Sequence, residues 1–354
     1  MSKFLTGRYQ DLAPYVPGEQ PKERRYVKLN TNESPFPPSK KAQALAKAQL
    51  QRLMLYPDPD CKALTQAIAE TYGVRERQVV VNNGSDETLY FAFLAYCDEN
   101  HPAVFLDITY GFYKVFAEFT ACPYVQIALN DDFTVPVDVL KQTKGTIFLA
   151  NPNAPTGLIL PMDRIEEIVA SDRDRMVVVD EAYVDFGGES CIPLLEKYDN
   201  LLITQTFSKS RSMAGARLGF GVANESVIDD LNRIRYSTNP YNVNAVTAAA
   251  GLGAIADTAY FVKNCRAIRE NRAWTKAELE KLGFTVTQSM ANFLFARHNR
   301  VDGETLYLKL KEKGVLVRHF NAERIRDYNR ITIGNRKEMQ ILIDTIKTIL
   351  EESK

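Results

Sequence analysis

The sequence lacks the charge imbalance that marks several classes of protein. Its 44 basic residues balance 44 acidic ones, and no long basic run interrupts that balance. A protein whose main partner is nucleic acid or an anionic membrane surface needs an excess of positive charge. We therefore expect small-molecule substrates attracted by local charges, and neither nucleic acid nor a membrane as partner.

Long apolar runs are missing as well. No segment approaches the roughly 18 uninterrupted apolar residues of a membrane-spanning helix, and residues 1–20 contain no apolar core of signal-peptide length. We therefore expect a cytoplasmic protein.

Cysteine and histidine are both sparse. The five cysteines are odd in number, scattered and never arranged as C-x-x-C. Neither a disulfide framework nor a zinc site is indicated, so we expect no metal and interpret the cysteines as small core residues. The chain has only three histidines.

What the sequence does contain is an alternation of short apolar runs with helical patterns. Its 354 residues exceed one minimal core and suit a large domain with a smaller one. The apolar runs, typical of strands covered on both faces, occupy residues 79–81, 103–107, 146–150, 176–180, 201–205 and 218–222. Helical patterns lie between them at residues 61–72, 85–97 and 163–170. This rhythm predicts an α/β fold whose large domain has a mostly parallel central sheet.

The sequence pattern differs on both sides of this α/β region. Residues 1–40 are rich in proline and predict an extended N-terminal arm, which leaves residues 41–240 for the large domain. After residue 240, two helical patterns lead into four short strands and a closing helix, over residues 245–256, 260–282, 284–287, 293–297, 315–318, 330–333 and from 337. The pattern predicts a smaller α+β domain over residues 241–354.

Polar residues follow five of the predicted strands. Ligands of open parallel sheets bind beyond the carboxyl ends of the strands. Those ends carry N-G-S-D (83–86), Tyr110, N-P-N-A-P-T-G (151–157), D-E-A-Y (180–183) and T-F-S-K (206–209). We therefore expect these segments to converge on one crevice.

The segment T-F-S-K, with Arg217 shortly after it, sets hydroxyls and a cation beside Lys209. A lysine amine can form an imine with an aldehyde when its surroundings favour the neutral amine. The hydroxyls and Arg217 suit a phosphate. The pattern therefore indicates an aldehyde cofactor with a phosphate group, although T-x-S-K alone also fits a solvated surface lysine.

The ordered set of motifs resembles the histidinol-phosphate aminotransferases, a branch of the fold-type-I enzymes that use pyridoxal 5'-phosphate (PLP). The resemblance spans nearly the whole chain. It rests on L-N-T-N-E-S-P (29–35), Y-P-D-P (56–59), N-G-S-D-E (83–87), N-P-N-A-P-T-G (151–157), V-D-E-A-Y (179–183), F-S-K (207–209), A-G-A-R-L-G (214–219), P-Y-N-V-N (240–244), A-N-F (291–293), G-V-L-V-R (314–318) and R-I-T-I-G (330–334). It implies the type-I PLP fold and amino transfer between L-histidinol phosphate and 2-oxoglutarate, giving imidazole-acetol phosphate and glutamate in L-histidine biosynthesis.

The resemblance also implies roles around the cofactor ring. Lys209 would hold PLP and then act as the general base, and no histidine stands at a strand end to compete with it. Asp180 closes an apolar run, and a buried carboxylate needs a partner such as the pyridine nitrogen; it could instead cap the next turn. Tyr183 would contact the ring oxygen, and Tyr110 would stack on the ring or else belong to the core.

The phosphate would lie at the start of the helix predicted at residues 85–97. Free backbone N–H groups at a helix start bind phosphate, although Ser85 could simply cap the helix. The implied phosphate ligands are Gly84, Ser85, Asp86, Thr206, Ser208 and Arg217.

One position departs from the family pattern. Relatives commonly read N-P-N-N-P-T-G, and the second of the adjacent asparagines donates a hydrogen bond to the ring oxygen. Here that position is Ala154, which has no donor. Asn153 is the nearest substitute, and we predict that it contributes to the cofactor site.

The remaining implied residues concern substrate and assembly. Tyr56 resembles a tyrosine that reaches the neighbouring subunit's PLP phosphate, which predicts a homodimer; the alternative is a local turn residue. Arginine forks bind carboxylate or phosphate, so Arg318 and Arg330 resemble substrate anchors, with a surface strand position as the alternative. Tyr15, Asn32 and Asn292 would complete the lining.

Three other functions fit parts of this pattern. An aromatic-amino-acid aminotransferase and a threonine-phosphate decarboxylase share the cofactor. A regulator or binding module built on the same fold is a different class, which the intact set Lys209, Asp180, Tyr183 and Arg217 disfavours.

Overall fold

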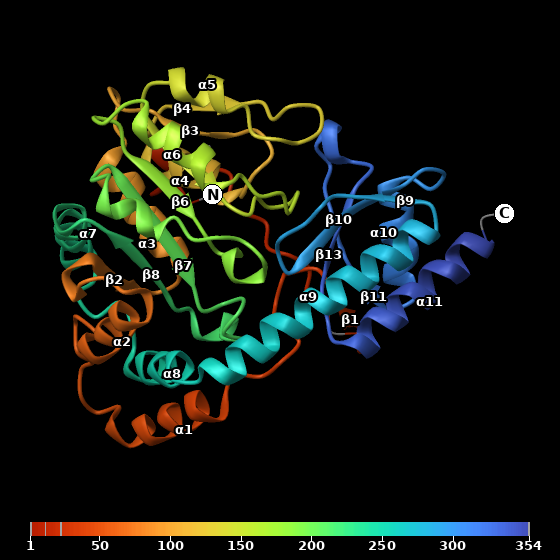
Figure 1. Cartoon of the computed structure of the whole chain (residues 1–354), viewed down its shortest axis with the longest axis horizontal. Helices are drawn as coiled ribbons and strands as arrows, with labels where there is room; N and C mark the ends of the chain where they lie inside the picture. Colours follow the sequence, from red (N-terminus) through yellow and green to blue (C-terminus); the bar gives the residue numbers. More distant parts are fainter. Residues whose placement is uncertain (1, 11, 22, 353–354) are drawn as a thin grey trace.

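Seven strands form the central sheet of the structure, a computed structural model that describes residues 2–10, 12–21 and 23–352 (Figure 1). In spatial order they are β2 (Val79–Asn82), β8 (Gly219–Ala223), β7 (Leu201–Thr206), β6 (Val177–Asp180), β5 (Thr146–Ala150), β3 (Ala103–Leu106) and β4 (Tyr124–Ile127). Strand β8 is antiparallel to both of its neighbours, and the other pairs are parallel. The prediction of a mostly parallel sheet is confirmed.

Helices cover both faces of this sheet. They are α2 (Lys62–Tyr72), α3 (Ser85–Tyr96), α4 (Phe112–Thr120), α5 (Val137–Gln142), α6 (Met162–Ala170) and α7 (Glu225–Thr238). Val177 and Val179 pack into the core layer that contains Ile68 of α2, whereas Val178 packs into the opposite layer with Phe93 of α3. Burial on both faces explains why the strands read as continuous apolar runs.

The smaller unit follows the long helix α9 (Thr258–Lys281), which runs from one unit to the other in Figure 1. Its antiparallel sheet has the order β12 (Arg318–His319), β13 (Asn329–Thr332), β10 (Phe293–His298) and β9 (Phe284–Val286). Helices α10 (Gly303–Glu312) and α11 (Arg336–Glu352) complete it.

The single strand predicted at residues 315–318 is divided into two short strands, because its two halves pair with different strands. Strand β11 (Val315–Leu316) pairs in parallel with β1 (Val27–Lys28). After Val317 the chain changes partner, and β12 pairs with β13 so that Arg318 lies opposite Arg330. That change of partner sets the two arginines side by side.

Helix α8 (Ala245–Ile255) packs against α1 (Lys40–Gln49) and α2, which belong with the large sheet. A Cβ atom on Gly253 would lie 2.6 Å from the Cα atom of Ala42, so only glycine allows this contact. The predicted boundary at residue 241 assigns α8 to the smaller domain, whereas the structure packs it on the larger one.

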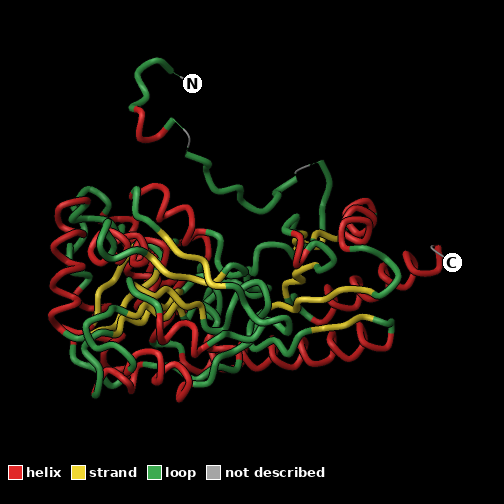
Figure 2. Tube along the Cα trace, turned by 90° about the horizontal axis from the view of Figure 1, so that it is seen from above, coloured by secondary structure: helices red, strands yellow, loops and turns green. Residues whose placement is uncertain are grey.

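The N-terminal arm, which Figure 2 shows crossing above the body, is mostly irregular, as its prolines predict. In this arm the ring of Tyr9 stacks on that of Phe119, with 5.5 Å between the ring centroids. The ring centroid of Tyr15 lies 4.3 Å from that of Phe112 in α4. Glu19 forms an ion pair with Lys311 of α10. The arm therefore contacts both units.

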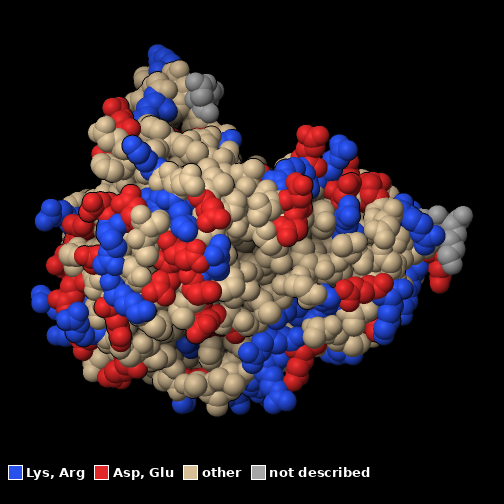
Figure 3. Space-filling view, turned by 45° about the horizontal axis from the view of Figure 1, so that its top comes forward, with Lys and Arg blue, Asp and Glu red and all other residues tan. Residues whose placement is uncertain are grey.

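Charges of both signs are interspersed over the face in Figure 3. Among the described residues no single helix is long and apolar enough to span a membrane, although α8 and α9, bent by 79°, together meet the length and composition. The same residues contain no group of three or more His, Cys, Asp or Glu side chains that could hold a metal ion.

Candidate active site

A cavity lies where β5, β6 and β7 end. Because parallel strands end at one edge, segments distant in sequence meet there. Its lining is Ser85, Asp86, Tyr110, Ala150, Ala154, Asp180, Ala182, Tyr183, Thr206, Ser208, Lys209 and Arg217. The structure therefore brings together most of the residues predicted to hold a cofactor.

Asp180 is a buried carboxylate held by two hydrogen bonds. Its Oδ1 accepts a hydrogen bond from the N–H of Ala182 at 3.1 Å, and its Oδ2 accepts one from the Tyr113 hydroxyl at 3.2 Å. Among the described residues no cation forms an ion pair with it, and burial raises its pKa to about 7. A protonated ring nitrogen in the cavity would supply the missing positive charge, so the site fits a pyridinium.

Lys209 lies at the wall of the cavity, after the end of β7. Its Nζ is 5.7 Å from the centroid of the Tyr183 ring. It forms no ion pair with any carboxylate that the structure describes, so its amine is available to a ligand. The Tyr183 hydroxyl accepts a hydrogen bond from the Asn32 amide at 3.0 Å.

The opposite end of the cavity is built for an anion. Helix α3 begins there at Ser85, and the first N–H groups of a helix have no partner within it. Strand β8 lies close to this helix start, because a Cβ atom on Gly219 would lie only 2.3 Å from the Ser85 nitrogen. The Thr206 hydroxyl accepts from the Ser208 N–H at 3.1 Å and so orders the T-x-S segment.

Arg217 adds a guanidinium at this end. Its Nη2 donates to Asp86 at 2.8 Å, and its Nη1 lies 3.4 Å from the Ser208 hydroxyl. The other oxygen of Asp86 accepts from the Tyr110 hydroxyl at 2.7 Å. Asp86 thus holds both Arg217 and Tyr110, and burial raises the pKa of Tyr110 well above its ordinary value, so its hydroxyl stays protonated.

A second cavity adjoins the first and shares Tyr110, Ala154, Tyr183 and Lys209 with it. It also contains four predicted substrate residues, Tyr15, Asn32, Arg318 and Arg330. The two cavities therefore meet at a wall that contains Lys209.

Two guanidinium groups of this second cavity lack a carboxylate partner among the described residues. Arg330 donates through Nη2 to the carbonyl of Asn30 at 3.1 Å, and its Nε is buried without a partner. Burial lowers the pKa of Arg330. Arg318 lies 5.8 Å from the ring centroid of Phe320. The pair offers positive charge to an anionic ligand.

Two predicted site residues point elsewhere. The amide nitrogen of Asn153 donates to the Ile108 carbonyl at 3.0 Å and to Thr156, and its oxygen accepts from Thr109, so its side chain orders the loop. Ala154 lies in the wall of both cavities instead, and Asn153 lines neither of them. Asn292 lines neither cavity; it donates to the Asn32 carbonyl at 2.9 Å from behind.

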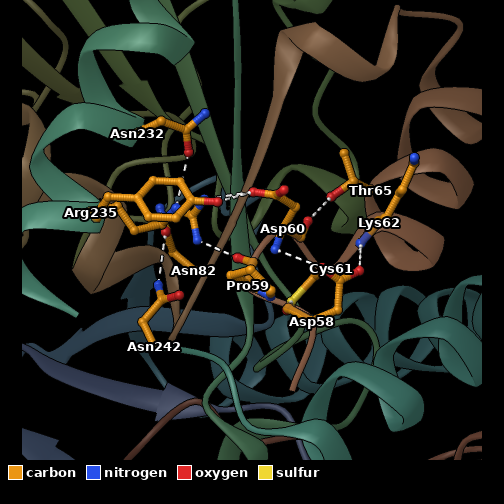
Figure 4. A network of polar contacts seen from close by, with 11 residues as sticks. Asp58, Pro59, Asp60, Cys61, Lys62, Thr65, Asn82, Asn232, Arg235 and Asn242 are labelled. Atoms are coloured by element: carbon orange, nitrogen blue, oxygen red, sulfur yellow. Dashed lines mark hydrogen bonds and ion pairs between the residues drawn. The ribbon is translucent and has the colours of Figure 1, made fainter. Parts of the chain in front are cut away.

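Tyr56 also lies outside both cavities of its own chain. It is 83% exposed and stacks on Tyr241 at 4.7 Å. Its loop is fixed by Arg235, which is only 2% exposed and donates to Asp60 at 3.1 Å (Figure 4). In the same figure Asn242 points toward Asn82, at 3.1 Å. A rigid loop therefore presents an exposed aromatic ring.

Sequence reasoning missed three residues beside this site. Tyr113 supports Asp180, Thr332 contacts Asn32, and Phe320 packs beside Arg318. Thr332 does stand in a noted segment, R-I-T-I-G, and Tyr113 lies three residues after Tyr110. Only the three-dimensional structure shows which side chains they meet.

Comparison with known proteins adds independent findings. The model of the family "Aminotransferase class I and II" matches residues 24–346. The chain is 46% identical, over 353 residues, to a protein of Brachyspira hyodysenteriae named histidinol-phosphate aminotransferase, covering 99% of this chain and 100% of that one.

Two solved structures share the fold. One is described as a putative histidinol-phosphate aminotransferase from Erwinia carotovora atroseptica, with a TM-score of 0.86, 28% identity and coverage of 93% of this chain and 97% of that one. The other is a histidinol-phosphate aminotransferase from Sinorhizobium meliloti in complex with pyridoxal-5'-phosphate, with a TM-score of 0.88, 21% identity and 99% coverage of both chains.

Proposed function

Because this chain belongs to the class I and II aminotransferases, we propose that it transfers the amino group of L-histidinol phosphate to 2-oxoglutarate, with PLP as cofactor. The products would be imidazole-acetol phosphate and glutamate. The near full-length relative with 46% identity supports this choice of donor within the family.

The observation that carries the proposal is the pair of uncompensated guanidinium groups in the second cavity. Arg318 and Arg330 face a space that also contains Lys209. The two substrates present different anions, one a phosphate and the other carboxylates. Planar guanidinium forks can bind either anion in pairs of hydrogen bonds, so one pocket would serve both half-reactions.

The first cavity supports PLP as the cofactor. Lys209 would bind its aldehyde, Asp180 its ring nitrogen and Tyr183 its ring oxygen. Tyr110 would cover the ring, and the phosphate would be held by the start of α3 (Gly84, Ser85, Asp86) with Thr206, Ser208 and Arg217. When bound, PLP supplies an electron sink for the substrate's Cα carbon.

Side chains of the protein would stabilise the charge of the cofactor ring and transfer the substrate's proton. The Asp180 carboxylate would keep the ring nitrogen protonated, because in this buried position the pair is more favourable than the lone carboxylate. The Lys209 amine, freed by the substrate, would take the Cα proton and return it. The arm residue Tyr15, which lines this cavity, would limit the access of water to this side of the pocket.

We further propose a cytoplasmic homodimer in which Tyr56 reaches the partner subunit's phosphate site. The exposed side chains of Leu53, Met54, Leu55 and Tyr56 support a protein partner for this loop, since such an apolar cluster is costly in water.

A donor screen tests the function directly. Purified protein with PLP and 2-oxoglutarate is supplied with histidinol phosphate, phenylalanine or threonine phosphate, and glutamate is measured. We expect glutamate chiefly from histidinol phosphate and none with Lys209→Ala, whereas Lys276→Ala, a lysine paired with Glu280 on α9, serves as the matched control.

Each rival gives a different result. A preference for phenylalanine would indicate an aromatic-amino-acid aminotransferase. Carbon dioxide released from threonine phosphate without 2-oxoglutarate would indicate the decarboxylase. Cofactor binding with no amino transfer from any donor would indicate a binding module.

A further inference from the structure

Asn32 stands between the two units of the molecule in an unusual backbone conformation. It is 1% exposed, and its φ of 56° lies in the left-handed region, which asparagine tolerates better than most residues. Its amide donates to the hydroxyl of Tyr183, on the loop after β6. Its other contacts reach β13 of the small sheet and the loop before β10. Asn32 thus connects the small unit to a residue of the cofactor cavity.

Thr332 of β13 holds Asn32 twice. The backbone N–H of Asn32 donates to the Thr332 hydroxyl oxygen at 2.9 Å, and the same hydroxyl lies 3.0 Å from the Asn32 side-chain oxygen. Thr332 is 3% exposed, so its hydroxyl cannot rely on water. Asn292 adds a bond to the Asn32 carbonyl at 2.9 Å, which fixes the backbone.

The single proton of the Thr332 hydroxyl decides which way the Asn32 amide faces. That proton needs an acceptor, and the Asn32 oxygen is the one that the described contacts provide. If the amide were turned around, both groups would present donors and the buried hydroxyl proton would have no acceptor. The Asn32 oxygen therefore faces Thr332, and its NH₂ group faces Tyr183.

This orientation determines the direction of the Tyr183 hydroxyl proton. Since the phenol oxygen accepts from Asn32, its own proton is not used in that bond. The Tyr183 side chain lines both cavities. Its proton is therefore free for an acceptor there, and accepting a bond from Asn32 makes the phenol a better donor.

We propose that Thr332 and Asn32 are positioning residues that direct the Tyr183 hydroxyl proton onto the ring oxygen of the cofactor. This inference rests on the proposed function, which places the cofactor's ring oxygen beside Tyr183. This relay of hydrogen bonds from Thr332 through Asn32 to Tyr183 is important because Ala154, in the cavity wall, has no side-chain donor and Asn153 bonds within its own loop. Tyr183 then supplies the side-chain hydrogen bond to that oxygen, and the small unit controls its direction.

Charged groups lie around Tyr183, and we expect a change at Thr332 to leave them in place. Lys209 lies over the ring, Arg330 and Asp180 line the adjoining walls, and the Tyr113 hydroxyl is bonded to Asp180. None of these groups bonds to Thr332. A change at Thr332 therefore tests the relay without changing the charge of the site.

The experiment compares Thr332→Val, which removes the hydroxyl at nearly constant shape, with Thr332→Ser, which keeps it. Each protein is loaded with PLP, and its visible absorbance is titrated with pH. A donor on the ring oxygen stabilises the negative charge there and eases loss of the neighbouring proton. We expect Thr332→Val to raise the apparent pKa of the visible band by roughly 0.5 to 1 unit, about one hydrogen bond's contribution, and Thr332→Ser to keep the wild-type value.

A double variant separates the relay from a general structural effect. In a Tyr183→Phe background the relay has no proton to direct, so adding Thr332→Val should produce no further shift. An equal shift in both backgrounds, or equal titrations of Thr332→Val and Thr332→Ser, would overturn the proposal.

A second route covers the case in which Thr332→Val does not fold. Asn32→Gly removes the amide and suits the left-handed backbone, and it should raise the apparent pKa in the same direction; an unchanged value would count against the relay. Wild-type protein that shows the visible band but transfers no amino group from histidinol phosphate would refute the proposed function, while the relay would still be judged by the spectral shift.

Discussion

Replacing Gly219 with alanine should damage the start of helix α3 and with it the binding of PLP. A Cβ atom at this position would lie 2.3 Å from the Ser85 nitrogen and 2.5 Å from the Gly84 carbonyl carbon, and both are backbone atoms that no side-chain rotation can move. Restoring a contact of 3.4 Å, where ordinary packing begins, requires the helix start to move by about 1 Å from β8.

Two effects of that shift can be estimated. Overpacking of this kind costs about 1 to 3 kcal/mol of stability. Losing one charge-assisted hydrogen bond to the phosphate costs about 1.5 to 3 kcal/mol, which weakens PLP binding roughly tenfold to a hundredfold.

Gly215 provides a matched control, because a Cβ atom there would meet nothing within 4 Å. The assay is the Tm of the cofactor-free protein and the Kd for PLP, measured by titrating the apoprotein. We expect both to worsen for Gly219→Ala and to stay near wild type for Gly215→Ala. Wild-type Tm and Kd in Gly219→Ala would refute the argument from close approach.

Three further predictions concern charge and assembly. Arg330→Ala should raise KM for both histidinol phosphate and 2-oxoglutarate in steady-state kinetics, because binding of each anion loses about 2 to 5 kcal/mol. The control Arg324→Ala, which disrupts an ion pair with Asp107, should leave both KM values unchanged. An effect on one substrate only would refute a shared anion pocket. Burial holds the pKa of Asp180 at about 7, above its ordinary 3.8, so the folded apoprotein binds the extra proton and its stability relative to Asp180→Asn should fall as pH rises between those values. Urea unfolding at several pH values measures that difference, and a constant difference would contradict it. Mixing Lys209→Ala with Tyr56→Phe subunits should restore part of the lost activity through heterodimers with one intact site, and no recovery under verified exchange would exclude a shared site.

The central sheet was predictable because its strands carry their signal locally. Val177, Val178 and Val179 are buried on alternate faces, which leaves an uninterrupted apolar run in the sequence. The strand at residues 315–318 was harder, because its division depends on pairing with β1 and β13, far away in the chain. Helix α1 carried no comparable signal: only Ala42 of it is buried.

The site was predictable where a residue type and a strand end coincide. Asp180 ends strand β6 and Lys209 follows strand β7, so their position at the cavity could be inferred. The orientation of the Asn153 side chain could not be inferred, because neighbouring residues point in different directions. Only the fold shows that Ala154 faces the cavity. The contact of Asn32 with Thr332 joins opposite ends of the chain, and no local pattern announces it.

The place of β2 at the edge of the large sheet has a consequence for how the chain folds during synthesis. Strand β2 pairs only with β8 in the described sheet, although β3 to β7 all lie between them in the sequence. The backbone groups of residues 79–82 therefore stay unpaired on the ribosome until residues 219–223 have emerged. Helix α3 follows β2 directly, so the anion end of the cavity is assembled late, after β3 to β7 have paired with one another.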